Sequence, residues 1–454
     1  MAYGSIHNRK PLERANRISH STVIANPVVQ ELLETISVPV PADPATLKTV
    51  LKNVPLVNNR QIRAVVAIDG SMREVSVRDE FPSATVTFFT FGPVLFKLEA
   101  LRELDSQPFI APEDLAILKN IQRYALALPT RNVARHGQTL RESVRQSLHE
   151  FFSSKSGDNE SLYVSLRWLM FRQWTRGGIK QWIIPSCPYE TCSNQDIVFS
   201  SATPDVQNCR VCGNPIYLID TARFHERIDE DQGASGISSY VLSLCEQMVL
   251  VHLIRSIWQM KPSLLREVLF IKDGPLACFG QIAPFSKPLR ELVNFLANQA
   301  DPNDPAMRLP LVNVVGLEKT GAFVEHAASI DEHMDTGSIL ILSDEYIYRY
   351  VVPGNSSGGG AYGHNTYWGN KVIFKAHDGN LYVATVPMKN GLSTDPDYGD
   401  FINLTEVLNA IAELRCSMYD NALIPVALAN RLVSLSEVPS TRILETFARQ
   451  IIMG

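Results

Sequence analysis

The chain has 454 residues, of which 45% are hydrophobic and 20% charged, and its formal net charge is −5. These values fit a globular protein with a sizeable core, and the length exceeds that of one average domain. The acidic balance excludes a global basic field for nucleic-acid binding, so any such contact needs a local basic patch.

Residues 1–61 are predicted to form an N-terminal arm with short helices. The first 20 residues are polar and basic and indicate either a flexible arm or a first helix. Helical patterns follow around 28–36 and 45–52, on either side of a proline-rich break. The chain opens without an apolar signal segment, and its apolar runs are too short to cross a bilayer. We therefore expect a cytoplasmic protein with no membrane contact.

Residues 62–111 are predicted to form the first part of an α/β core. An apolar strand is expected at 62–71, and Asp69 lies near its end, followed by Gly70 and Ser71. Alternating residues predict a second strand at 72–77, and a long β-rich run predicts a third at 85–98. Because these strands follow one another directly, we expect an antiparallel meander.

Residues 112–235 are predicted to be an insertion into that core, made of helices and a metal-binding ribbon. Pro112 stands where a first helical residue should, and 139–142 reads as a capping box, so we expect helices over 112–177. These helices could form an ordinary covering layer or a surface for a dimer or another partner.

Four of the seven cysteines lie between positions 187 and 212, namely Cys187, Cys192, Cys209 and Cys212. The second pair has the Cys-x2-Cys spacing followed by Gly213, which is typical of a zinc knuckle. We predict a structural zinc ribbon, because a closed four-thiolate site keeps no open position for catalysis. The alternatives are four free cysteines, or His225 in place of one ligand.

Residues 236–454 are predicted to complete the core, beginning with a helix at 238–260. Glu246 is the only charged residue on the apolar stripe of that helix. A carboxylate on a buried face is costly unless it is paired or binds a metal. Glu246 is therefore expected either to ligate a metal at the sheet or to pair with a nearby arginine.

A short apolar run at 268–271 predicts a central strand buried on both faces, and the strand stops at Asp273, before Gly274 and Pro275. Asp273 and Asp69 would then meet at the carboxyl edge of the sheet, where open α/β sheets place their chemistry. Two adjacent carboxylates repel each other unless a cation lies between them. The sequence therefore predicts a divalent-metal site.

Further elements follow in the order helix (284–300), strand (311–317), β-rich segments (338–352 and 366–387) and a helical tail from position 403. Lys319 follows the strand and could hold a phosphate as a point charge, or it could be an ordinary surface lysine. The Gly/Ser-rich stretch 354–363 is a candidate lid.

This order of elements predicts a ribonuclease-H-like core, an α/β fold with a mixed five-stranded sheet flanked by helices and interrupted by the helical and zinc-ribbon insertion. Such cores use clustered carboxylates to hold two divalent ions for phosphodiester hydrolysis. Ligands that are all oxygen atoms suit Mg²⁺ or Mn²⁺.

Within this order, the sequence resembles the NurA family of DNA-end-processing nucleases over 62–98 and 236–435. The stretches similar to the family's motifs are Ala67–Ser71, Glu246, Asp273–Leu276, Val315–Lys319 and the closing helix Ala422–Arg431. The family also has a tyrosine and a histidine late in the chain, and Tyr367 and His377 are the best positional matches.

The resemblance implies a homodimer that docks on a HerA-type hexameric ATPase, a translocase that feeds duplex DNA to the nuclease for repair or for defence against foreign DNA. It also implies roles for single residues. Asp69, Glu246 and Asp273 would hold the metal ions, and Lys319 would steady the scissile phosphate. His377 would assist proton transfer or ligate a metal, although the sequence itself favours a surface histidine before a turn.

Two other classes remain open at this point. An Argonaute-like protein shares the core fold but would need a guide-binding half, which the sequence does not show. A non-catalytic subunit would use the zinc ribbon to bind DNA and the core as a scaffold.

Overall fold

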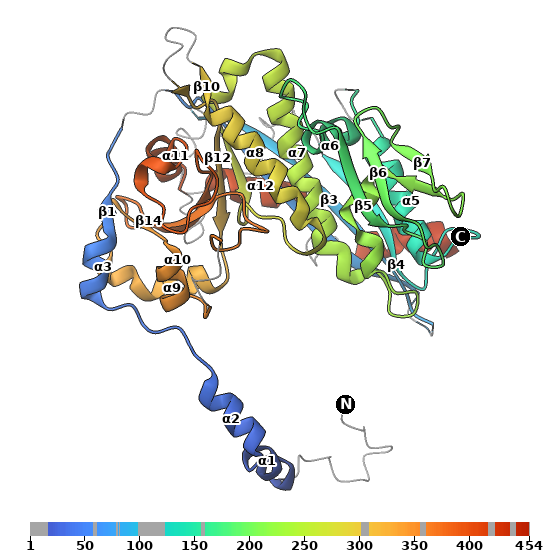
Figure 1. Cartoon of the computed structure of the whole chain (residues 1–454), viewed down its shortest axis with the longest axis horizontal. Coiled ribbons are helices and arrows are strands. Elements are labelled where there is room, and N and C mark those ends of the chain that lie inside the picture. The colour runs from blue at the N-terminus through green and yellow to red at the C-terminus, as the bar shows by residue number, and fades with distance from the viewer. Residues whose placement is uncertain are drawn as a thin grey trace.

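The computed structural model describes residues 17–57, 61–78, 80, 82–98, 123–155, 159–300, 308–354, 360–415, 423–435 and 442–453. The fold is mixed α/β, with one large sheet flanked by helices (Figure 1). The described strands of this sheet are nine, in the order β1-β13-β14-β15-β12-β9-β2-β3-β4.

The strands come from almost the whole length of the chain. Their bounds are β1 (Leu51–Asn53), β2 (Ala64–Arg78), β3 (Ala84–Lys97), β4 (Tyr124–Arg131), β9 (Val268–Asp273), β12 (Asn313–Glu318), β13 (Ser338–Ile341), β14 (Asn370–Lys375) and β15 (Leu381–Val386). Strands β2, β3 and β4 form an antiparallel meander, and β9 runs parallel to both β2 and β12. The carboxyl ends of β9 and β12 therefore lie at one edge, beside the middle of the long strand β2.

One face of the sheet is covered by α7 (Ser238–Met260) and α8 (Ser286–Ala297), with α5 (Leu140–Ser153) and α6 (Leu162–Met170) beyond them. Val66, Ile68 and Phe270 belong to the core on this face. Their neighbours Ala67 and Ile271 join the core on the opposite face, as the two-residue period of a strand requires. Both faces are thus buried, which explains the continuous apolar run in β9.

The opposite face is covered by α11 (Leu404–Ala412) and α12 (Ile424–Val433). At the far end of β2 and β3, α13 (Arg442–Met453) packs through Leu444 and Ala448. A third core lies at the β13–β15 end and is formed with α3 (Pro44–Val50), α9 (Ala322–Ile330) and α10 (Asp344–Tyr350).

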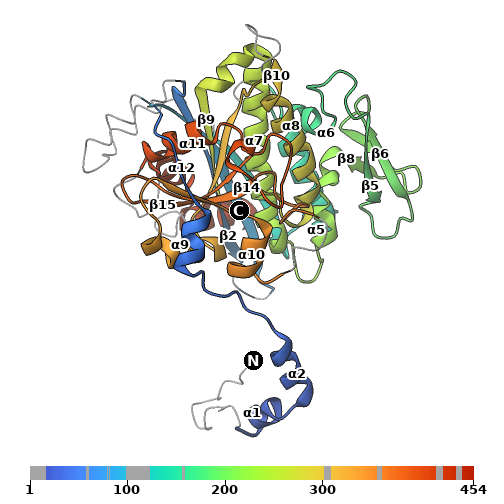
Figure 2. The ribbon, with the colours of Figure 1, turned by 60° about the vertical axis from the view of Figure 1, so that its left-hand side comes forward.

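The N-terminal helices α1 (Arg17–Ile24) and α2 (Pro27–Thr35) stand away from this body (Figure 2). Helix α2 has no buried residue, and its apolar side chains Val28, Leu32 and Leu33 are exposed. Helices α1 and α2 therefore add no buried residue to the core in the part of the chain that the structure describes.

Helix α7 confirms the helix expected at 238–260. By length and composition, the segment Ser235–Met260 could cross a membrane, so our expectation that no segment is long and apolar enough was wrong. However, 72% of its most apolar window is buried inside the fold, against β2 and β3 among others. Such burial is typical of the core helix of a globular protein.

Several sequence predictions need correction. The strands expected at 62–71 and 72–77 are one strand, β2, because no turn residue breaks the pairing with β3 after Ser71. Residues 124–131 are strand β4 rather than helix, since Tyr124, Leu126 and Leu128 alternate with exposed neighbours. The third strand of the meander is therefore β4.

The predicted five-stranded sheet is also too small, because β1, β13, β14 and β15 extend it beyond β12. Residues 346–352 are mainly helix α10 rather than strand, and the side chain of Ser343 caps this helix by accepting from the Tyr346 N–H. The helix start expected at Pro112 and half of the candidate lid, residues 355–359, lie outside the described residues. The division into 1–61, 62–111, 112–235 and 236–454 stays a prediction.

Candidate active site

Asp69 and Asp273 lie on adjacent parallel strands. In the register of β2 and β9, Ala67 pairs with Ile271 and Ile68 with Lys272, so the two aspartates occupy the next positions along. Residues two apart on a strand share a face, so both aspartates point to the side of Ala67 and Ile271. The structure thus confirms that the two predicted strands are neighbours.

The carboxylate of Asp69 is buried, with the residue only 6% exposed. Its Oδ1 accepts a hydrogen bond of 2.7 Å from the Gly70 N–H, whereas its Oδ2 is buried without a hydrogen-bond partner. Burial raises the pKa of Asp69 to about 7, and the neighbouring charges of Asp273 and Glu246 add to the effect. The three carboxylates are therefore close enough to repel one another.

Glu246 reaches this edge from α7, passing over Gly70. A Cβ built on Gly70 would lie 3.0 Å from Glu246 Oε1, so the glycine leaves space for the carboxylate. Glu246 Oε2 is 3.0 Å from the Nζ of Lys272, and both side chains are buried. Burial raises the pKa of Glu246 and the charge of Lys272 opposes this. The partner of Glu246 is therefore a lysine of β9, not an arginine.

Lys319 lies immediately beyond β12, and its Nζ is 2.7 Å from Asp273 Oδ2. The side chain of Lys319 is 39% exposed and that of Asp273 is 20% exposed. Two of the three carboxylates are thus each paired with a lysine, and of the three only Asp69 has a buried oxygen with no hydrogen-bond partner.

Two features of the three carboxylates suit a divalent ion. Their donor atoms are oxygens, which Mg²⁺ and Mn²⁺ prefer, and one oxygen of Asp69 has no hydrogen-bond partner. Their oxygens do not all lie within 4.8 Å of one another, since in the described part of the chain only four cysteines form such a group. As the side chains lie, the three carboxylates therefore do not converge on one point, because Asp69 and Asp273 point to the face of Ala67 and Ile271 and Glu246 comes from α7 on the other face.

Tyr367 and His377 differ in their placement. Tyr367 is buried and forms an isolated β-bridge with Ala277, on the segment that follows Asp273. His377 lies in the turn after β14, with its ring against Gly337. Strand register places β14 three strands from β9, so His377 is roughly 20 Å from Asp273. The structure does not bring His377 to the carboxylates.

Two charged residues of this edge were missed from the sequence. The sequence predicts Lys272 only as part of a strand end, although a lysine directly after four apolar residues indicates a buried charge. Lys371 on β14 forms a buried ion pair with Glu318, and its Nζ lies 4.6 Å from the centre of the Tyr367 ring. These pairs show that the edge balances its carboxylates with ammonium groups.

The four cysteines form a second, separate cluster. Their sulfur atoms all lie within 4.8 Å of one another, which confirms the predicted grouping. The ligands flank two hairpins, β5 (Gln181–Ser186) with β6 (Gln195–Ser200), and β7 (Val206–Asn208) with β8 (Pro215–Tyr217). Four thiolates are the donor set of a closed tetrahedral zinc site. His225 is buried outside this group.

In the second cysteine pair, Cys209 and Cys212, the surroundings of Cys209 favour a thiolate. Burial works against the charged form of Cys209, but the N–H groups of Cys212 and Val211 and the amide of Asn194 outweigh it. Together they lower the pKa of Cys209 to about 6. A thiolate stabilised in this way is a better metal ligand at neutral pH.

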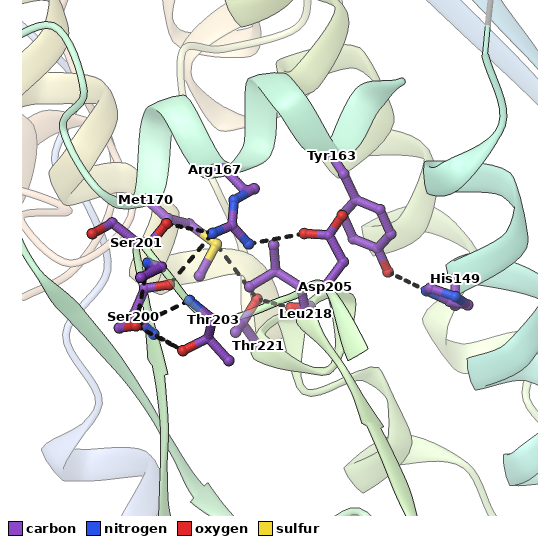
Figure 3. Close-up of polar contacts among 11 residues, drawn as sticks. His149, Tyr163, Arg167, Met170, Ser200, Ser201, Thr203, Asp205, Leu218 and Thr221 are labelled. Carbon is purple, nitrogen blue, oxygen red and sulfur yellow. Dashed lines mark hydrogen bonds and ion pairs between the residues drawn. The ribbon is translucent and has the colours of Figure 1, made fainter. Parts of the chain in front are cut away.

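Side chains of α6 fasten the ribbon to the body (Figure 3). Arg167 donates to Asp205 at 2.9 Å and to the carbonyl oxygen of Ser201 at 2.7 Å. Next to it, the Tyr163 hydroxyl and His149 Nδ1 are 2.9 Å apart. The cluster is thus tied to the helical layer that packs on α7.

We expect the purified protein to contain one zinc ion per chain, and Cys209→Ser to lose it. Serine cannot supply a thiolate, so metal content and melting temperature should fall together. Elemental analysis and thermal melts would measure both. Cys245→Ala, which removes a buried thiol outside the cluster, should keep its zinc. Full zinc occupancy in Cys209→Ser would contradict the assignment.

We expect Gly70→Ala to lower the free energy of unfolding by about 1–3 kcal/mol, the usual cost of overpacking. The new Cβ would lie 2.6 Å from Leu242 Cδ1 and 3.0 Å from Glu246 Oε1. Gly236→Ala is the matched control, because a Cβ there meets no atom within 4 Å. Denaturant unfolding should separate the two variants, and equal stabilities would show that Glu246 does not need this space.

Comparisons with known proteins give only distant likeness. No protein-family model matches the chain, and no curated protein matches it. Among solved structures, the NurA nuclease from Sulfolobus solfataricus is similar with a TM-score of 0.34 and 10% identity, over 96% of this chain and 98% of that one. A second NurA structure has a TM-score of 0.30 and 11% identity, over 96% and 97%. Likeness of this size does not establish a shared function.

Proposed function

We propose that this protein is a divalent-metal-dependent nuclease that hydrolyses phosphodiester bonds in DNA. The observation that carries the proposal is the partnerless, buried carboxylate oxygen of Asp69, beside Glu246 and Asp273 at the carboxyl edge of the sheet. A buried carboxylate without a partner is costly, and a bound cation would offset that cost.

The topology supports a ribonuclease-H-like core within the larger sheet. Its strands β4, β3 and β2 are antiparallel, and β9 and β12 then continue parallel to β2. Helix α7 precedes β9 and α8 connects β9 to β12. Such cores place carboxylates on the first strand, on a helix and on the fourth strand. In this chain those elements are β2, α7 and β9, which carry Asp69, Glu246 and Asp273.

In this proposal Asp69, Glu246 and Asp273 would hold Mg²⁺ or Mn²⁺, and such an ion would supply Lewis-acid activation of water and stabilisation of the leaving oxygen. Lys319 holds a phosphate oxygen, because its ammonium group is partly exposed and lies beside Asp273. Lys272 is buried and keeps Glu246 oriented until a metal ion binds. Tyr367 borders the site, and His377 takes no part.

We further propose the setting that the sequence resemblance implies, a cytoplasmic homodimer working with a HerA-type translocase in repair or defence. The exposed apolar side chains of α2 support a partner surface, since isolated patches of this kind are often covered in assemblies. The acidic net charge fits a partner that supplies DNA affinity. The cysteine cluster would hold structural Zn²⁺.

One observation favours the second candidate, a non-catalytic DNA-binding scaffold. Glu246 and Asp273 are each paired with a lysine, so the edge approaches charge balance without a metal ion. Cleavage assays distinguish the two candidates, because only a nuclease needs the carboxylates to be free for metal.

The deciding experiment measures cleavage of end-labelled linear DNA with Mn²⁺, with Mg²⁺ and with EDTA, with and without a HerA-type translocase. We expect metal-dependent loss of full-length DNA for the wild type and for Asp335→Asn, an exposed control. The cleavage rate of Asp273→Asn should be at least about a hundredfold lower than that of the wild type. This loss exceeds the usual effect of changing a residue that only hydrogen-bonds to a metal ligand. DNA binding without cleavage under every condition would favour the scaffold.

A further inference from the structure

We propose that Phe279 is a stacking platform that holds an unpaired nucleobase beside the carboxylate edge. This inference rests on the proposed function, because it names the form of nucleic acid that the site takes, a single-stranded or frayed end. It is carried by the placement, rigidity and exposure of one aromatic ring.

Phe279 is the last residue of the segment 274–279, which follows Asp273 directly. Six residues reach at most about 20 Å, so the ring lies within a few nucleotides of any phosphate held at the carboxylates. The segment is fixed on both sides. Gly274 N–H donates to the carbonyl oxygen of Leu317 at 2.7 Å, and Cys278 N–H donates to that of Thr366 at 2.8 Å. The ring is therefore carried by ordered backbone.

The packing beneath this segment is tight. A Cβ on Gly316 would lie 2.6 Å from the carbonyl oxygen of Gly274, so the chain passes directly over β12. On the other side of the ring, a Cβ on Gly280 would lie 2.6 Å from the ring of Tyr240. The backbone before and after Phe279 is therefore closely packed, and a ring carried by ordered backbone loses less entropy when a base stacks on it.

The ring of Phe279 is backed by aromatic residues but not covered by them. Its centroid is 5.5 Å from that of Tyr367 with an interplanar angle of 85°, an edge-to-face contact that leaves a face unstacked. Phe279 is 41% exposed, whereas Tyr367 is buried. In the described part of the chain, only Phe447 is another phenylalanine with such exposure.

Basic residues lie on the elements that neighbour Phe279 in the chain and in space. Arg290 of α8 donates to the carbonyl oxygens of His364 at 2.6 Å and Tyr367 at 2.5 Å, and Tyr367 is the residue whose ring contacts Phe279. Lys287 on the same helix is exposed, and Lys319 lies at the carboxylate edge. A stacking ring combined with backbone-binding cations is the usual arrangement for single strands.

The test is binding of a fluorescent 12-nucleotide oligothymidine to the full chain, by anisotropy, in EDTA and again in Ca²⁺. Phe279→Ala should weaken binding roughly 5- to 100-fold, the range for loss of one base–aromatic stack. Phe279→Trp should bind at least as tightly as the wild type. Phe447→Ala, which removes the other exposed phenylalanine ring, should bind like the wild type.

A second arm shows whether the partner of Phe279 is a base. A set of oligonucleotides is used, each of which lacks the base at one position. Wild type and Phe279→Ala should bind with equal affinity only to the oligonucleotide that lacks the base stacked on Phe279. The proposal would be overturned if Phe279→Ala bound the oligonucleotide as tightly as the wild type. It would also be overturned if Phe279→Ala lost the same affinity for every abasic oligonucleotide, and either result would favour a protein-docking role. The outcome is separable from the nuclease assignment, because stacking can be present when no metal supports cleavage, and cleavage can be present without stacking.

Discussion

Asp69→Asn is expected to stabilise the metal-free protein at pH 8 and to abolish its metal-dependent cleavage of DNA. Asparagine keeps the oxygen that accepts from the Gly70 N–H but removes the charge of a buried, partnerless carboxylate oxygen. The same charge is what a divalent ion would bind. Stability and activity should therefore change in opposite directions, as at sites where function conflicts with stability.

The pH dependence follows from the raised pKa of Asp69. The folded protein holds its proton up to about pH 7, whereas the unfolded chain releases it near pH 4. The free energy of unfolding therefore falls as pH rises from about 4 to 7, by at most about 4 kcal/mol, and then levels off. Asp69→Asn lacks this fall, so its advantage should grow across that window.

Thermal or denaturant unfolding at several pH values, in EDTA, would measure this difference. Asp395→Asn, an exposed carboxylate, should follow the wild type at each pH. Addition of Mn²⁺ should then stabilise the wild type and leave Asp69→Asn unchanged, because only the wild type keeps the ligand. A wild type that is insensitive to both pH and Mn²⁺ would rule out a charged, metal-binding Asp69.

Lys272→Met is the second large effect that we expect, a loss of about 3–5 kcal/mol in the free energy of unfolding without divalent ions. Lys272 and Glu246 are both buried and 3.0 Å apart, so removal of the lysine leaves a buried carboxylate unpaired. Adding Glu246→Gln to Lys272→Met removes that charge and should restore most of the stability.

Lys319→Met is the matched control, because it removes the lysine of the neighbouring pair in a more exposed setting. Exposed pairs contribute at most about 1 kcal/mol, so this variant should stay close to the wild type. Mn²⁺ should stabilise Lys272→Met more than it stabilises the wild type, since Glu246 is then free to ligate. Equal losses in the two lysine variants would show that burial does not govern these pairs.

The aspartates and the cysteines could be predicted from the sequence because their signals are local. Each aspartate follows a run of apolar residues, and these two runs pair side by side in the parallel strands β2 and β9. The cysteine ligands lie within 26 consecutive positions, so spacing alone indicates their grouping. Glu246 was found because one charged residue interrupts an otherwise apolar helix face.

The remaining features depend on distant parts of the chain. Lys272 pairs with a glutamate of α7, and nothing in the strand itself indicates that partner. His377 matches a family pattern by position, but the turn after β14 places it three strands away. Strand β4 was missed although its alternating burial follows the two-residue period, because helical signals before and after it were given more weight.

The pairing of β2 with β9 affects how the chain folds while it is being synthesised on the ribosome. Ala64 pairs with Val268, so about 200 residues must be added after the first strand before its parallel neighbour exists. At usual elongation rates this takes roughly 10–40 s. During that time β2 and β3 can form a hairpin, but one edge of β2 stays open. Nascent chains of this protein should therefore depend on chaperones until α7 and β9 have left the exit tunnel.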